Sequence, residues 1–174
     1  DKLDIVTDES GNKVVLLPEI IFSNKQNINW DDVEDYLGKY VGELIEIAET
    51  RDIIYIGNKF PDEYGGSSYT RKTKGARAKA KANVAQGIRE MVEIATDKVY
   101  RENHKEKHSE DAHNGWFYYV TRFAIPLYNN EKKTGEYNVY SACLVVNHAA
   151  NGKMYLYDVV GIKKEASNPL KTIK

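Results

Sequence analysis

The chain has 174 residues, 41% of them hydrophobic and 29% charged, which is the composition of one globular domain rather than of a disordered chain. No apolar run approaches the roughly 20 residues that span a bilayer, and the single cysteine, Cys143, excludes an intrachain disulfide. The net charge is −1, but residues 1–50 hold 12 acidic and 4 basic side chains, whereas residues 51–125 hold 10 acidic and 14 basic ones. Because the chain begins with Asp1 rather than methionine, we expect it to be a piece of a longer polypeptide.

The N-terminal third is predicted to hold a hairpin, a helix and a short strand. Apolar runs at residues 5–7 and 14–17 flank a polar turn, so residues 1–28 are expected to form a β-hairpin extension. Apolar residues then recur at three-to-four spacing, which predicts an amphipathic helix over about 31–50, capped by Asn29 or Asp31. Residues 53–56 are predicted to form a short buried strand that ends at Gly57.

Residues 58–75 contain Pro61, Gly65 and Gly66 and are predicted to form an ordered surface loop. A second helix is predicted over about 76–97. Its expected core face comprises Ala80, Val84, Ile88, Met91, Val92 and Ala95.

A basic stripe runs through this loop and helix. Between Tyr64 and Arg89 there are seven basic side chains and no acidic one. They are Arg71, Lys72, Lys74, Arg77, Lys79, Lys81 and Arg89, of which we expect Lys79, Lys81 and Arg89 to project outward from the helix. Such a stripe attracts a polyanion or an acidic protein.

Three alternating segments follow, at residues 116–127, 137–147 and 154–162, and predict a three-stranded antiparallel meander. The expected class is therefore α+β, with two main helices packed on an antiparallel sheet. Residues 163–174 are polar and are expected to form a loose tail.

Three of the four histidines fall within ten residues, just before the meander. Imidazole can exchange a proton near neutral pH, and lysine can hold a phosphate, so His104, His108 and Lys107 suggest acid–base chemistry on a phosphodiester. A solvated polar connection is the plain alternative. Zinc bound by His104, His108 and His113 is a third interpretation, which the lysines at 105 and 107 disfavour. We expect no metal and no cofactor.

Arg122 lies on the first meander strand, on the same face as Trp116 and Tyr118. A buried arginine needs an anion, so it is expected either to pair with a carboxylate such as Asp158 or to bind a phosphate. Tyr140 and Tyr157, on the neighbouring strands, could complete an aromatic floor with Tyr118.

Four runs carry a resemblance to a known family: PDEYGGSSYTRK, AKAKANVAQGIREMVEIATDK, ENHKEKH and LYDVVGIKKE. Together they resemble a cargo domain of large polyvalent proteins of phages and mobile elements, grouped with the barnase/EndoU/colicin/RelE-like nucleases. The likeness spans roughly residues 55–168. It implies helices packed on an antiparallel sheet, with the active site of a metal-independent ribonuclease on the sheet's open face. The EndoU branch is similar in using two histidines and a lysine, although its histidines lie further apart in sequence.

The leading hypothesis is a toxin-like endoribonuclease that cleaves RNA by attack of the 2′-OH. His104 and His108 would be the acid–base pair, and Lys107 and Arg122 would hold the phosphate. The expected substrate-binding residues are Tyr69, Thr70, Arg71, Lys72, Tyr118, Tyr140 and Tyr157. The expected partners are RNA and a cognate inhibitor protein, and no membrane is expected. The expected location is the bacterial cytosol, to which a phage or effector would deliver this cargo.

A non-catalytic module is the alternative from another class. In it the basic stripe binds nucleic acid or an acidic partner protein, and the histidines have no chemical role. Incubation with labelled RNA and DNA in EDTA separates the two hypotheses.

Overall fold

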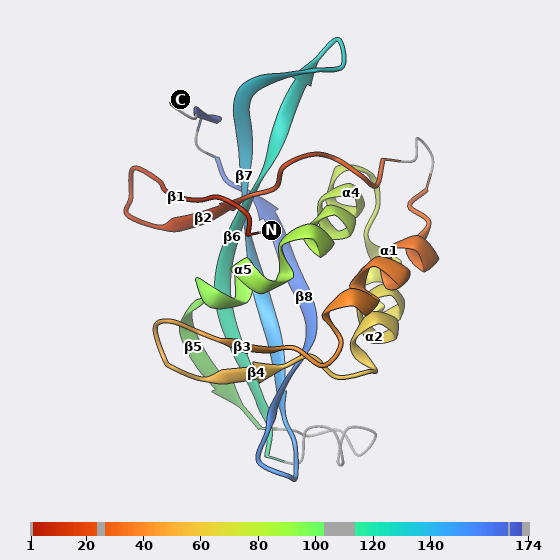
Figure 1. The fold of residues 1–174 in the computed structure, drawn as a ribbon, viewed down its shortest axis with the longest axis vertical. Coiled ribbons are helices and arrows are strands. Elements are labelled where there is room, and N and C mark those ends of the chain that lie inside the picture. The colour runs from red at the N-terminus through yellow and green to blue at the C-terminus, as the bar shows by residue number, and fades with distance from the viewer. Residues whose placement is uncertain (1, 24–26, 103–113, 167, 172–174) are drawn as a thin grey trace.

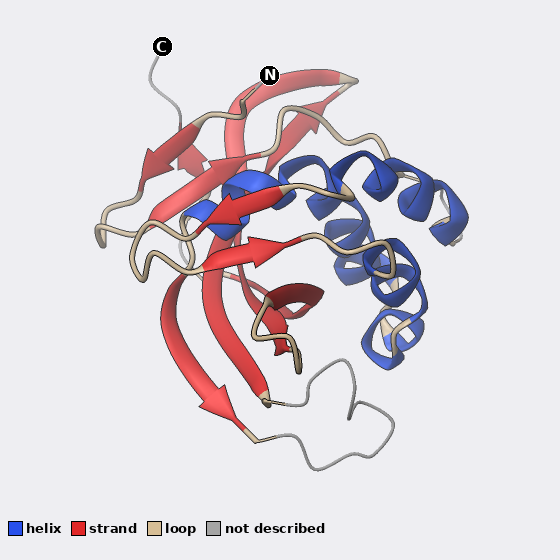
Figure 2. Cartoon of the chain, turned by 60° about the horizontal axis from the view of Figure 1, so that its bottom comes forward, coloured by secondary structure: helices blue, strands red, loops and turns tan. Residues whose placement is uncertain are grey.

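A computed structural model describes residues 2–23, 27–102, 114–166 and 168–171. The class is α+β, as predicted: short helices lie on one side of a large curled sheet (Figures 1 and 2). The sheet order is β1-β2-β6-β7-β8-β4-β3, with β5 also paired to β6 and β9 to β7. The strands are β1 (Ile5–Thr7), β2 (Lys13–Leu16), β3 (Leu44–Glu46), β4 (Ile53–Tyr55), β5 (Thr96–Arg101), β6 (Trp116–Asn129), β7 (Lys132–His148), β8 (Met154–Lys164) and β9 (Leu170–Lys171).

The helices are short, and most follow one another in the middle of the chain. They are α1 (Trp30–Leu37), α2 (Phe60–Gly66), α3 (Ser68–Lys72), α4 (Gly75–Asn83) and α5 (Ile88–Glu93), with 3₁₀ turns at Gly38–Tyr40 and Val84–Gly87. In the described part of the chain, none of these helices is long and apolar enough to cross a membrane.

The sheet is mixed, which corrects the expectation of an antiparallel one. Strands β6, β7 and β8 pair antiparallel, as do the hairpin strands β1 and β2. However, β2 runs parallel to β6, and β4 runs parallel to β8. The two edges of the meander are thus closed by N-terminal segments that the sequence does not mark as its neighbours.

The helix predicted over 31–50 ends early. Asn29 caps α1, as its Oδ1 accepts a hydrogen bond from the Asp31 amide at 3.1 Å, but the helix stops at Leu37. Gly42 then adopts φ +93°, and its amide donates to the Ile56 carbonyl at 2.8 Å. The helical path has already ended at Val41, whose ψ is 129°, and residues 44–46 then pair with β4 as strand β3.

The loop predicted over 58–75 is largely helical, which is a second correction. Pro61 lies in the first turn of α2, where its missing N–H costs nothing, and Ser67 caps α3 by accepting from the Thr70 amide at 3.1 Å.

The helix predicted over 76–97 is divided into α4, a 3₁₀ turn and α5, and it ends before β5 begins at Thr96. Its predicted core face is correct, since all six residues are at most 1% exposed. The division falls at Gly87, where a Cβ atom would lie 3.1 Å from Leu17 and 3.3 Å from Val15, so glycine lets the helix approach β2 closely.

The predicted loose tail contains a further strand. Leu170 of β9 pairs with Tyr137 of β7 and packs against a small second core, formed by Val14, Leu16, Ala124 and Val139, on the opposite face of the sheet from the helices. The main core lies between the helices and the sheet.

Candidate nucleic-acid interface

Four cations of the basic stripe are exposed on consecutive elements. Arg71 and Lys72 end α3, Lys74 precedes α4, and Arg77 lies in its first turn. None of the four has an ion-pair partner among the residues that the structure describes. We refer to Arg71, Lys72, Lys74 and Arg77 as the basic ridge. Its charges are available to an external anion.

Arg89 is exposed, as expected, but it is paired. Its Nε donates to Glu43 Oε1 at 2.9 Å, and this hydrogen bond raises the pKa of the guanidinium. The glutamate neutralises its charge locally, so Arg89 adds little to the positive field of the ridge.

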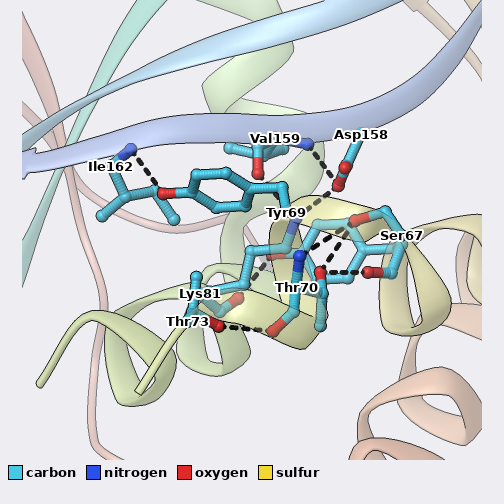
Figure 3. A network of polar contacts seen from close by, with 9 residues as sticks. Ser67, Tyr69, Thr70, Thr73, Lys81, Asp158, Val159 and Ile162 are labelled. Atoms are coloured by element: carbon cyan, nitrogen blue, oxygen red, sulfur yellow. Dashed lines mark hydrogen bonds and ion pairs between the residues drawn. The ribbon is translucent and has the colours of Figure 1, made fainter. Parts of the chain in front are cut away.

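Lys81 does not project outward, which corrects the prediction. Its side chain is 0% exposed, and its Nζ donates to Asp158 Oδ1 and, at 2.6 Å, to the Val159 carbonyl (Figure 3). The ammonium also lies 4.0 Å from the centre of the Tyr64 ring, a favourable cation–π distance. Lys81 is therefore a structural residue of the interior rather than a ligand of an external phosphate.

A β-bulge in β8 lies next to this buried pair. Val145 of β7 pairs with Asp158, but the next residue, Val146, pairs with Leu156, so β8 carries one extra residue here. A bulge interrupts the backbone ladder and re-aims side chains. The ion pair also meets the backbone groups of the next residue: Asp158 Oδ1 accepts from the Val159 amide at 2.8 Å, and Lys81 donates to the carbonyl of the same residue.

Burial opposes both charges of this pair. Desolvation lowers the pKa of Lys81 from 10.5 to about 8, although Asp158 acts in the opposite direction. Desolvation likewise raises the pKa of the Asp158 carboxyl, although the Lys81 ammonium and the Ser67 hydroxyl favour its charged form. Both pKa values therefore move in the direction set by desolvation, which outweighs the attraction within the pair.

The lowered pKa of Lys81 predicts how stability depends on pH. Between about pH 8 and 10.5 the unfolded chain holds a proton that folded Lys81 has lost, so the free energy of unfolding should rise with pH. Urea unfolding at pH 7.5 and 9.5, compared with Lys81→Met/Asp158→Leu, isolates this contribution. The free energy of unfolding of the parent minus that of the double variant should be larger at pH 9.5 than at pH 7.5. A constant or falling difference contradicts the lowered pKa.

The same network fixes α3 to the sheet. The Thr70 hydroxyl donates to the Tyr64 carbonyl at 2.6 Å, and the Tyr69 hydroxyl accepts from the Ile162 amide on β8 at 2.9 Å (Figure 3). Thr70 is only 1% exposed. Of the four substrate-binding residues predicted in this segment, Tyr69 and Thr70 therefore use their hydroxyls within the protein, and Arg71 and Lys72 are exposed.

Arg122 pairs with a carboxylate, but not with the one expected. Its Nε donates to Glu165 Oε1 at 3.2 Å, whereas Asp158 belongs to Lys81. Arg122 lies on β6 beside a cavity of about 410 Å³. To hold a phosphate it would have to exchange Glu165 for that anion.

The three meander tyrosines do not form one floor. Tyr140 stacks on Phe123, with ring centres 5.3 Å apart, on the face that packs against the main core. Tyr157 instead contacts Trp116, with ring centres 5.1 Å apart, and Tyr118 shares the face of Trp116 by alternation along β6. Tyr118 and Tyr157 are thus on the sheet's outer face, and Tyr140 is on the inner one.

His104, Lys107, His108 and His113 lie outside the described residues. Both flanks of this histidine segment are anchored at one end of the sheet: Arg101 pairs with Trp116 across β5 and β6, and the Asn114 amide donates to the His148 carbonyl at 2.8 Å. Arg122 is six residues further along β6 from Trp116, about 20 Å at the usual rise of a strand. The ridge lies on α3 and α4, so the described parts of the predicted site are spread over separate surfaces.

No group of three or more His, Cys, Asp or Glu side chains in the described ranges could hold a metal ion. Comparison with family models, with curated proteins and with solved structures finds no match for this chain.

Proposed function

We propose that this domain binds RNA and that the basic ridge is its docking surface. The observation that carries the proposal is that Arg71, Lys72, Lys74 and Arg77 are exposed on adjoining elements, with no ion-pair partner in the described chain. Contacts between such cations and phosphates supply most of the sequence-independent affinity for nucleic acids. The resemblance to a superfamily of ribonucleases favours RNA over an acidic protein.

The attachment of α3 supports this proposal. Ser67 and Thr70 brace the turn between α2 and α3, and Tyr69 ties α3 to β8. Cations on an anchored helix lose less conformational entropy on binding than cations on a mobile loop. The ridge therefore presents a fixed pattern of charge to a phosphate backbone.

Replacing Arg71, Lys72 and Lys74 by alanine should weaken RNA binding and flatten its dependence on salt. Each lost phosphate contact lowers the slope of log K against log salt by about 0.7 for a single strand, so the triple variant should lose about 2 in slope. Fluorescence anisotropy with a labelled single-stranded RNA between 50 and 300 mM salt measures this change.

A charge-matched variant controls for net charge. Lys13, Lys132 and Lys133 are exposed on other elements, and their replacement by alanine removes the same number of charges. This control should keep most of the parental slope. Equal slopes for the two triple variants would mean that the ridge is not the docking surface.

Metal-independent cleavage of the bound RNA is the second candidate function. It is favoured by the residues at the sheet end to which the histidine segment connects, where the Arg101 guanidinium lies 5.8 Å from the centre of the Tyr118 ring, next to Trp116. His104 and His108 would be the acid–base pair, and Lys107 and Arg122 would stabilise the phosphate. A cytosolic toxin of this kind would be carried in a larger polyprotein and would have a cognate inhibitor.

A further inference from the structure

The outer face of the sheet, on the side away from the helices, carries an aromatic cluster (Figure 2). Trp116 and Tyr118 alternate along β6 onto this face, and Tyr157 of β8 contacts Trp116 with ring centres 5.1 Å apart. All three residues are partly exposed. We refer to Trp116, Tyr118 and Tyr157 as the outer aromatic cluster. Their flat rings are accessible surfaces on which another ring can stack.

The apolar surface extends beyond these rings to the strands on either side of β6. Val99 of β5 and Val145 of β7 both pair with Tyr118, so the three side chains lie side by side across three strands. Val99 is 47% exposed, whereas Val145 is only 7% exposed. An apolar surface of this kind, open on a folded domain, marks an interaction site.

The rings of the cluster are held in place by the fold. Trp116 and Tyr157 meet edge to face, at 76° between the ring planes. The Arg101 guanidinium lies 5.8 Å from the centre of the Tyr118 ring, within the range of a cation–π contact. Rings that are fixed before a ligand arrives lose little conformational entropy when the ligand stacks on them.

Cations flank the cluster on two sides. Arg101 is exposed at the end of β5, opposite Trp116, and has no carboxylate partner in the described chain. Further along the sheet, Arg122, Ser141 and Lys163 form a row across β6, β7 and β8. Glu165 neutralises Arg122, but Arg101 and Lys163 leave positive charge beside the rings. The surface therefore suits an anionic partner.

We propose that the outer aromatic cluster stacks the bases of an unpaired RNA strand, with Arg101 beside its phosphates. Aromatic rings together with cations are the combination that holds a single strand, because each base has a flat face and each linkage a negative charge. In a duplex the base faces are covered by the neighbouring base pairs and cannot stack on a protein. This inference rests on the proposed RNA binding and names the class of RNA: the ridge attracts any phosphate backbone, and the cluster selects an unpaired one.

Fluorescence of Trp116 tests the proposal directly, because a base that stacks on an indole quenches its emission. The chain has two tryptophans, and Trp30→Phe leaves Trp116 as the only one. Hexauridylate should quench this variant saturably, whereas a short RNA duplex and a peptide of ten glutamates should not. The proposal is overturned if hexauridylate gives no quenching, or if the duplex or the peptide quenches as strongly.

Tyr118→Leu supplies a second measurement that does not depend on the tryptophan. By fluorescence anisotropy it should weaken hexauridylate binding about tenfold at every salt concentration, since stacking is worth roughly this much per base and releases no counterions. Duplex binding should stay at the parental level. Tyr128→Leu is the matched control, because Tyr128 is 40% exposed on the same strand, ten residues further along. It should bind hexauridylate like the parent.

The ridge and the cluster fail in different ways. The ridge variant should lose salt slope but, combined with Trp30→Phe, should still show quenching at saturation. Tyr118→Leu should lose affinity but keep the parental slope. Equal hexauridylate affinity in Tyr118→Leu and the parent overturns the role of the cluster, whatever the result for the ridge.

Discussion

Replacing Lys81 by methionine should lower the free energy of unfolding by about 3–5 kcal/mol, the usual cost of breaking a buried ion pair by removing one partner. Methionine fills much the same volume, so the loss comes from leaving the Asp158 carboxylate buried without its cation. The Val159 carbonyl also loses a donor. Urea unfolding at pH 7, followed by circular dichroism, measures the change.

Two matched variants show whether the effect belongs to the pair. Lys79→Met, two residues away on α4 and partly exposed, should change stability little. Lys81→Met/Asp158→Leu should lose clearly less than the single variant, because it leaves no unpaired charge. The single variant Asp158→Leu completes the comparison. If the double variant loses as much stability as Lys81→Met and Asp158→Leu lose together, the two side chains act independently.

The spacing of apolar residues predicts an element correctly where the contacts of the folded chain favour the same secondary structure. The core face of the 76–97 segment is correct because the residues from Ala80 to Ala95 pack on the sheet in their helical order. The 31–50 segment fails because Leu44 and Ile45 satisfy helical spacing and yet pair with β4. The partner strand decides the outcome, and it does not follow from spacing.

The two parallel pairings are beyond sequence reasoning for the same reason. Val15 of β2 pairs with Phe123, more than a hundred residues away, and Ile54 of β4 pairs with Met154. Apolar periodicity says which face of a strand is buried, but it does not name the neighbouring strand. These contacts turn an antiparallel meander into a larger mixed sheet.

The interior of the site was predictable in part. A buried arginine needs an anion, and this argument correctly predicts that Arg122 pairs with a carboxylate. It names Asp158 as the candidate, whereas the structure pairs Arg122 with Glu165 and pairs Asp158 with Lys81 from α4. The available signal was that alanines flank Lys81 on both sides, since small residues let a helix approach a sheet closely. No sequence signal marked Asn147, whose side-chain oxygen is buried without a hydrogen-bond partner in the described chain.

If the domain cleaves RNA, His104→Ala and His108→Ala should each lower the rate about a hundredfold or more, with little change in melting temperature. RNA carries its own nucleophile, so cleavage needs a base for the 2′-OH, an acid for the leaving 5′-oxygen and cations for the phosphate. The products should end in 2′,3′-cyclic phosphates, EDTA should not inhibit, and DNA should be spared because it lacks the 2′-OH. Gel analysis of labelled RNA and DNA measures all three properties.

His148 provides the matched control for these variants. It lies beside Phe117, with ring centres 5.5 Å apart, on a strand of the sheet rather than in the histidine segment. His148→Ala should therefore leave cleavage largely intact, which separates loss of the proposed acid–base pair from loss of any imidazole. Full activity in the His104→Ala/His108→Ala double variant would remove this pair from the mechanism. Absence of cleavage by the parent domain across varied RNAs, with binding intact, would leave RNA docking on the ridge as its function.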